Sequence, residues 1–206
     1  MKGLLLKEWC VLKKYFRLTL TVCAVMLICG AYTGNWLFIF TAVTVAGSSA
    51  TSLISYDERS RFSEYLKFMP LRARTIVSAK YAVMLILTLG FTLCGVCLRM
   101  IFMHFGGGGD YAETVVYGTF VVCAGLVSPC LTMPFAFFKG VEKARMIYVL
   151  GIAVAFAAAG AVSVGEPQSI AAAFPLWTAA AAMIFSAVIT AVSYAASVRL
   201  YRLNRN

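Results

Sequence analysis

The sequence predicts an all-α integral membrane protein with six transmembrane helices, and three observations lead to this fold class. The mean hydropathy is +0.87, 62% of the 206 residues are hydrophobic, and only 13% are charged. Soluble domains carry about 25% charged residues, so the chain lies far outside that class. The apolar runs are continuous and do not alternate with period two, which indicates helices rather than the strands of a barrel.

Six apolar runs approach or exceed the length of about 20 helical residues that crosses the hydrocarbon core of a bilayer. The first run is the shortest. Because the runs occupy most of the chain, we expect residues 1–206 to form a single transmembrane domain. In chain order the runs are Leu18 to Tyr32, Trp36 to Tyr56, Tyr81 to Met103, Thr114 to Phe138, Met146 to Val164, and Phe174 to Val198.

Basic residues gather in alternate connections between these runs. Seventeen of the 18 Lys and Arg residues fall in residues 1–17, 57–80, 139–145 and 199–206, and the other three connections contain none. The positive-inside rule places these basic segments and both termini in the cytoplasm. We therefore expect a multi-pass protein of a cell membrane, in a bacterium the cytoplasmic membrane. The net charge of +10 fits anionic lipid headgroups, and we expect no nucleic acid partner.

Residues 1–17 form an amphipathic pattern when successive residues are placed 100° apart. Lys7 belongs to a basic sector, and Trp9 belongs to the opposite, apolar side. This pattern predicts an interfacial helix lying at the membrane surface, which either anchors the chain or also contacts a partner. Glu8 falls among the apolar residues, so it requires a nearby cation or a protein neighbour, because lipid does not solvate a carboxylate.

Two features inside the runs depart from a plain apolar span. Arg99 lies about one turn before the outer end of the third run, where its side chain can reach the headgroups or meet Asp110 or Glu113. Pro129 and Pro134 each remove a backbone donor from the fourth run and predict a kinked or broken helix.

No enzymatic chemistry is predicted for this chain. The runs contain no paired carboxylates, no clustered His and no nucleophile beside a base, so we expect no catalytic residues and no metal site. The phosphate-binding motif G-x-x-x-x-G-K-[ST] is absent from the sequence. We therefore expect no cofactor bound by this chain, and we interpret its seven cysteines as small packing residues.

The connection from 57 to 80 is too short for a domain and long enough for two short helices separated at Pro70. Asp57 or Ser60 can cap the first of them. That helix carries one apolar stripe at spacings of three and four, with charged residues beside it. Such a helix either lies on the membrane or fills a groove on a partner protein. The stripe consists of Phe62, Tyr65, Leu66 and Met69.

The order of these segments resembles the permease subunits of type 2 ABC exporters, in particular a small branch of about this length. The resemblance includes "LLLKEW" in the N-terminal helix, two spans, a segment "DERS…YLKFMP…R…IVSAKY", and four further spans. The chain departs from that pattern at Met69, where the branch has Leu, and at Arg72 and Ala73, where it has a hydroxyl residue. The matching positions are Asp57, Glu58, Pro70, Arg74, Ser78, Lys80 and Tyr81.

This resemblance implies a permease that forms half of a translocation path and couples to a separate ABC ATPase subunit, which holds ATP and Mg. It also implies a second permease copy or a homologous permease as a partner within the lipid bilayer. The connection from 57 to 80 would be the coupling loop, with a smaller contact at Lys139, Glu142 and Lys143. The docking residues it implies are Asp57, Glu58, Arg59, Arg61, Phe62, Glu64, Tyr65, Leu66, Met69, Pro70 and Arg74.

Composition adds an expectation about cargo and leaves one alternative function. The runs are dominated by apolar residues without a broad polar stripe, which favours an amphiphilic cargo such as a peptide, a lipid-like molecule or a drug. The alternative is a membrane protein without a transport role, such as an immunity or assembly factor whose basic loop binds lipid or a regulator. The sequence does not distinguish a homodimer from a heterodimer.

Overall fold

The fold is described from a computed structural model that places residues 2–60, 62, 73–106, 111–140, 143–144, 146, 149–150 and 176–205. Every long element within these residues is an α-helix, as the sequence predicts. The helices are α1 (Lys2–Tyr15), α2 (Arg17–Thr33), α3 (Trp36–Arg59), α5 (Ala73–Gly106), α6 (Tyr111–Lys139) and α9 (Leu176–Arg205).

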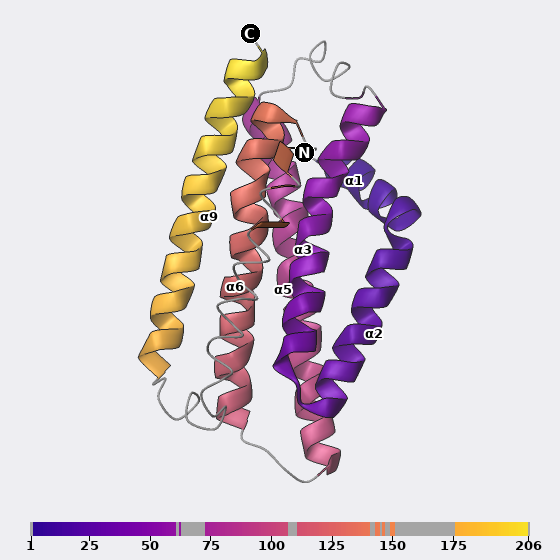
Figure 1. Cartoon of the computed structure of the whole chain (residues 1–206), viewed down its shortest axis with the longest axis vertical. Coiled ribbons are helices and arrows are strands. Elements are labelled where there is room, and N and C mark those ends of the chain that lie inside the picture. The colour runs from indigo at the N-terminus through magenta and orange to yellow at the C-terminus, as the bar shows by residue number, and fades with distance from the viewer. Residues whose placement is uncertain are drawn as a thin grey trace.

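Three helices, α3, α5 and α6, form the centre of an elongated bundle, with α2 on one side and α9 on the other (Figure 1). Helix α3 packs against α1, α2, α5 and α6. In its most apolar window 61% of residues are buried, against 17% for α9. Helix α9 therefore presents a large apolar surface outward, including Ile184, Phe185 and Val192. In water such a surface would be an aggregation liability, whereas lipid solvates it.

Four described helical segments are long and apolar enough to cross a membrane: Trp36–Arg59, Ala73–Gly106, Thr114–Phe138 and Thr178–Leu203. They correspond to the second, third, fourth and sixth predicted spans. Helix α2 covers the first and has 17 residues, and it follows α1 at a bend of 77°, so this pair adds at most one further span. Most of the fifth predicted span lies outside the described residues. The described part of the chain thus holds four or five candidate spans, and six spans stay a prediction.

Both ends of the chain lie toward the same end of the bundle (Figure 1). We call this the basic end: it comprises α1, the start of α5 and the last turns of α3, α6 and α9. Arg59, Arg74, Arg199 and Arg202 are all exposed there. The turns from α2 to α3 and from α5 to α6 lie at the opposite end, which we call the far end. This arrangement matches the predicted grouping of connections, while its orientation in a membrane stays a prediction.

The turn at the far end between α2 and α3 has local causes. Gly34 ends α2 with a φ of 74°, a left-handed conformation that favours glycine. Asn35 then caps α3, because its side-chain oxygen accepts a hydrogen bond from the Leu37 amide at 3.0 Å. Two helices of the bundle are therefore joined in antiparallel order by two residues.

Small residues let the central helices approach closely. A Cβ added at Gly47 in α3 would lie 2.9 Å from Thr88 Oγ1 of α5, and one added at Gly125 in α6 would lie 2.8 Å from Val43 Cγ1 of α3. Both distances are shorter than carbon contacts allow, so larger residues would force the helices apart. Farther along α3 and α6, the Thr51 and Thr132 hydroxyls form a buried hydrogen bond of 3.2 Å.

The helices reach farther into the predicted coupling loop than the sequence indicates. Helix α3 continues to Arg59 and α5 begins at Ala73, so Asp57 lies inside α3 and Ser60 follows its last turn. The prediction that Asp57 caps a separate helix was wrong, because the backbone bonding of α3 continues past it to the Ser60 amide, which donates to Tyr56 O at 2.9 Å. The same prediction for Ser60 depends on residues 61 and 63–72, which lie outside the described residues. Of the residues between Ser60 and Ala73, the structure describes only Phe62.

Candidate functional site

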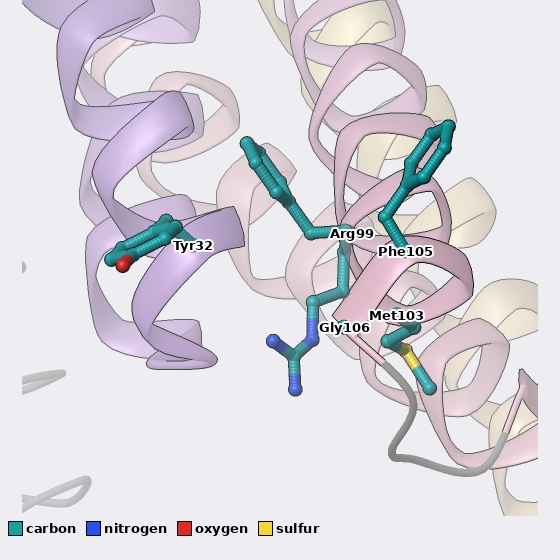
Figure 2. Close-up of a pocket in the computed structure, with 6 residues that line it drawn as sticks. Tyr32, Arg99, Met103, Phe105 and Gly106 are labelled. Carbon is teal, nitrogen blue, oxygen red and sulfur yellow. The ribbon is translucent and has the colours of Figure 1, made fainter.

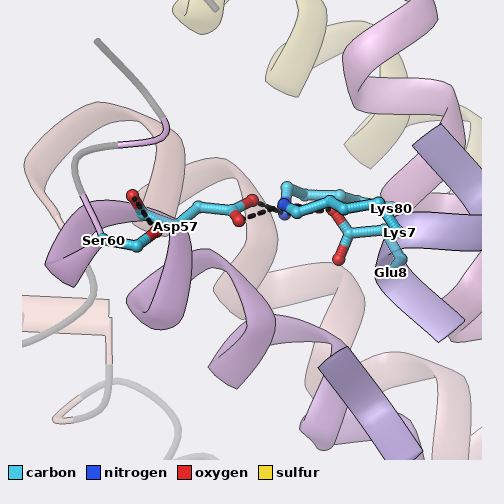
Figure 3. A network of polar contacts seen from close by, with 5 residues as sticks. All are labelled: Lys7, Glu8, Asp57, Ser60 and Lys80. Atoms are coloured by element: carbon cyan, nitrogen blue, oxygen red, sulfur yellow. Dashed lines mark hydrogen bonds and ion pairs between the residues drawn. The ribbon is translucent and has the colours of Figure 1, made fainter. Parts of the chain in front are cut away.

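Four charged side chains from three helices meet at the basic end (Figure 3). We call them the ionic cluster: Lys7 and Glu8 of α1, Asp57 of α3 and Lys80 of α5. The Asp57 carboxylate accepts a hydrogen bond from Lys7 on one oxygen and from Lys80 on the other, the latter at 2.5 Å. Glu8 Oε1 lies 3.3 Å from Lys7 Nζ and 3.2 Å from Lys80 Nζ. Each cation thus contacts both anions.

The ionic cluster is formally neutral and almost fully enclosed. The side chains of Glu8, Asp57 and Lys80 are 3%, 8% and 5% exposed, and that of Lys7 is 26% exposed. Removing one partner from a buried ion pair costs about 3–5 kcal/mol, because the other charge then stays buried without compensation. Each of the four charges is therefore compensated only while the others are present, and together the four residues hold α1, α3 and α5 in one relative position.

The structure confirms the prediction that Glu8 has a nearby cation or a protein neighbour, since it contacts Lys7 and Lys80 and is buried against the bundle. Helix α1 reaches this position because part of its apolar side packs on the bundle. Leu12 is 1% exposed and forms a core cluster with Leu53 of α3 and with Val83 and Leu87 of α5. That side of α1 therefore contacts protein at Leu12 rather than lipid alone. Other apolar residues of α1 remain exposed, namely Leu6, Trp9 and Tyr15, and the interfacial position stays a prediction.

The ionic cluster lies at the base of the predicted coupling loop. Asp57 and Lys80 are the first and last residues of that loop: Asp57 is in the last turn of α3, and Lys80 is about two turns into α5. Lys7 Nζ also lies 4.0 Å from the centroid of the Phe62 ring, within the range of a cation–π interaction. Helix α1 therefore contacts the helix before the loop, the helix after it, and one residue within it.

The predicted docking residues are divided between the interior and the surface. Glu58, Arg59 and Arg74 are exposed, and Phe62 is half-buried beside Lys7. Asp57 is buried, and both of its oxygens are bonded within the chain, so the expectation that its side chain meets a partner does not fit the structure. The other predicted docking residues lie outside the described residues: Arg61, Glu64, Tyr65, Leu66, Met69 and Pro70.

The second predicted contact adjoins the end of α3. Lys139 is the last residue of α6, Lys143 is exposed, and Glu142 lies outside the described residues. Between them Gly140 has a φ of 84°, and a Cβ added there would lie 4.0 Å from Glu58 Oε1. The two segments that the sequence assigns to partner contacts are therefore neighbours in space.

A second polar cluster lies on the other side of α5. We call it the neutral cluster: Tyr81, Ser193, Ser197 and the backbone carbonyl of Cys130. Tyr81 Oη lies 2.6 Å from Ser193 Oγ and 2.8 Å from Ser197 Oγ, both on α9. Ser193 Oγ donates to the Cys130 carbonyl of α6 at 2.5 Å. These contacts join α5, α6 and α9 through uncharged groups.

The neutral cluster also explains how α6 tolerates proline. Cys130 O would normally accept from the amide four residues later, but that residue is Pro134, which has no N–H. The Ser193 hydroxyl supplies the missing donor. Helix α6 is continuous to Lys139 through both Pro129 and Pro134, so the predicted break is absent, and the Ser193 hydroxyl accounts for the carbonyl left by Pro134. The predicted kink stays a prediction.

The sequence alone assigns no role to Lys80 beyond its place in the "SAKY" match. One signal was available: Asp57 and Lys80 flank the same connection between antiparallel spans, so opposite charges lie at neighbouring helix ends. The contacts of α1 gave no such signal, because Lys7 is 50 residues from Asp57 and Glu8 is 72 residues from Lys80.

Comparison with known families gives one match along nearly the whole chain. The sequence model of the family described as "ABC-2 family transporter protein" matches residues 3–202. This range contains the ionic cluster, the neutral cluster and the predicted docking segment. Neither the curated proteins nor the solved structures give a match to the chain.

Proposed function

Since the chain belongs to the ABC-2 family of transporter proteins, and is thereby the membrane component of an ABC transporter, we propose that it is the permease of an exporter. It forms half of the translocation path, and a second copy or a homologous permease forms the other half. A separate ATPase subunit binds ATP and Mg, which agrees with the missing nucleotide-binding motif. The cargo is amphiphilic, in keeping with the apolar composition of the spans.

The observation that carries the coupling part of this proposal is the ionic cluster. A partner that pushes on the segment between Ser60 and Ala73 acts on the ends of α3 and α5, which Asp57 and Lys80 join directly. Buried ionic contacts are directional, and in several proteins they fix the register of neighbouring elements. Helices α1, α3 and α5 therefore move together when the loop is displaced, as in hinge or shear transitions of packed helices.

The exposed part of the predicted docking surface carries charges of both signs. Glu58 and Arg59 end α3, Arg74 begins α5, and Lys143 lies near the end of α6. Charges at the rim of an interface mainly orient the partner and accelerate association, while buried apolar residues supply most of the affinity. We therefore assign orientation to these four residues and affinity to the Phe62, Tyr65, Leu66 and Met69 stripe.

Co-purification tests the docking role. The chain is co-expressed with the ABC ATPase encoded nearest to it and purified through a tag on this subunit, and both ATPase retention and ATP turnover are measured. We expect Phe62→Ala with Leu66→Ala to lower retention by about tenfold or more. Truncating an apolar anchor at the centre of an interface typically costs about 2 kcal/mol or more of binding free energy. The matched control is Leu203→Ala, an exposed apolar residue at the basic end of α9.

Two results would count against the proposal. Full retention and unchanged turnover in the double variant would remove the docking role of the stripe. Failure of any ABC ATPase to co-purify with the wild-type chain would instead favour a membrane protein without a transport role.

A further inference from the structure

A pocket of about 370 Å3 lies at the far end of the bundle, where α5 passes the end of α2. Figure 2 shows the Arg99 side chain extending from α5, with Tyr32 of α2 across from it. Nothing in the proposed docking and coupling functions uses this pocket, which is at the opposite end from the ionic cluster. Its lining residues are Tyr32, Arg99, Phe102, Met103, Phe105 and Gly106.

The charge of Arg99 is not neutralised by any acidic side chain that the structure describes; Asp110 and the side chain of Glu113, which the sequence offers as partners, lie outside the described part of the chain. Its Nη1 donates to the backbone carbonyl of Ala31 at 3.1 Å, and this is its one hydrogen bond among the described residues. Its Nε is buried without a partner, and no ion pair among those residues includes it. A guanidinium has five N–H donors, so most of them remain available to a ligand.

The guanidinium is held in place by the turn between α2 and α3. A Cβ added at Gly34 would lie 2.9 Å from Arg99 Nη2, so the guanidinium lies directly against this turn, where the φ of 74° favours glycine. The last carbonyls of α2 carry the negative end of the helix dipole, which favours a cation at this position. Arg99 is thus fixed at the end of α2 rather than extended freely toward the headgroups.

The walls of the pocket are aromatic and open to the surroundings. Tyr32 is 75% exposed and Phe105 is 84% exposed. The Tyr32 and Phe102 rings make an edge-to-face contact between α2 and α5, with centroids 5.8 Å apart. A fixed cation therefore lies beside a surface that suits hydrocarbon rather than water.

We propose that this pocket binds an anionic amphiphile. Arg99 pairs with its phosphate or carboxylate group, for which the planar guanidinium offers two parallel donors. The exposed rings of Tyr32 and Phe105 contact the hydrocarbon part of the molecule. A lipid headgroup and a free phosphate ion share the anionic chemistry, and the requirement for a tail distinguishes them.

Native mass spectrometry of the chain in a neutral detergent tests this site. The purified protein is titrated with phosphatidylglycerol, with phosphatidylcholine and with inorganic phosphate, and the bound fraction is measured for each. We expect saturable binding of phosphatidylglycerol and at least tenfold weaker binding of the other two probes, since one lacks net charge and the other lacks a tail. Equal binding of phosphatidylcholine, or displacement of phosphatidylglycerol by inorganic phosphate, would overturn the proposal.

Variants then assign the binding to the pocket. Arg99→Gln should weaken phosphatidylglycerol binding by about tenfold or more, because a charge-assisted pair is lost. Arg99→Lys should keep part of the affinity, and Arg202→Gln, at an exposed arginine of the basic end, serves as the matched control and should keep all of it. Should Arg99→Gln fail to fold, Tyr32→Ala with Phe105→Ala alters only exposed rings and should also weaken binding. Wild-type affinity in the folded Arg99 or ring variants would contradict the assignment.

Discussion

Lys80 and Tyr81 are consecutive residues of α5, yet they belong to polar clusters of different kinds. Lys80 points toward α1 and α3 and joins the ionic cluster, whereas Tyr81 points toward α6 and α9 and joins the neutral cluster. Both residues are 4% exposed. One helix thus makes a charged contact on one side and an uncharged contact on the other at the same depth, so burial alone does not explain the choice of residues.

The two kinds of cluster respond differently when one member is lost. A charge without its partner keeps its full desolvation penalty in a buried site, so the ionic cluster works as a unit of four. A hydroxyl that loses a partner costs about 1 kcal/mol and has other groups within reach. The side of the bundle that contains the predicted coupling loop is therefore the side on which helices cannot shift independently, and the α9 side tolerates adjustment.

The largest effect is expected for Lys80→Met. This change leaves Glu8 and Asp57 with Lys7 as their common cation and should lower the free energy of unfolding by about 3–5 kcal/mol. Unfolding of the purified chain is followed by circular dichroism in mixed detergent with rising dodecyl sulfate. Lys143→Met removes an exposed lysine at the same end and should change the value by less than about 0.5 kcal/mol. Equal effects of the two changes would show that the ionic cluster is not a unit.

An intermediate effect is expected for Ser193→Ala. It removes the hydroxyl that donates to Cys130 O and should cost about 1–3 kcal/mol in the same assay, because a buried carbonyl is left unpaired. In a Pro134→Ala background the amide of residue 134 can bond Cys130 O within α6, so the cost of Ser193→Ala should fall by at least half. An unchanged cost in that background would mean that Ser193 does not replace the donor missing at Pro134.

The smallest effect is expected for Tyr81→Phe. The phenyl ring keeps its place in the core formed with Met84, Leu126 and Met133, and Ser193 keeps its hydrogen bond to the Cys130 carbonyl. The free energy of unfolding should fall by about 1 kcal/mol. A loss as large as that of Lys80→Met would erase the difference between the clusters.

The sequence predicted the spans better than their ends. The second predicted span begins at Trp36, as α3 does, because a long apolar run between Asn35 and the charged segment leaves little choice. The sequence predicts that this span ends before Asp57, because charged residues are typical of loops. Helix α3 instead continues to Arg59, because the Asp57 carboxylate is paired with two lysines inside the bundle. Neutralisation by residues far along the chain is not visible in a local pattern.

The candidate site was predictable in part. Glu8 stood out because a carboxylate on an apolar face needs a partner, and Pro134 indicated that the fourth run lacks a backbone donor. The identity of the partners was not predictable, since Lys80 and Ser193 are brought there by the packing of whole helices. A charge or a missing donor can therefore reveal that a contact exists, but the fold decides which residue makes it.

The most direct test of the account separates stability from coupling. In one variant the ionic cluster becomes apolar, with Lys7→Met, Glu8→Leu, Asp57→Leu and Lys80→Met. Apolar replacement of a complete buried ionic group is often neutral or stabilising, so this variant should fold and should retain the ATPase. ATP turnover of the purified complex is then measured for wild type, for this variant and for Tyr81→Phe. We predict that the apolar variant no longer influences the ATP turnover of the bound ATPase, whereas Tyr81→Phe influences it as the wild-type chain does. Wild-type turnover in a folded apolar variant would contradict the coupling role of the ionic cluster.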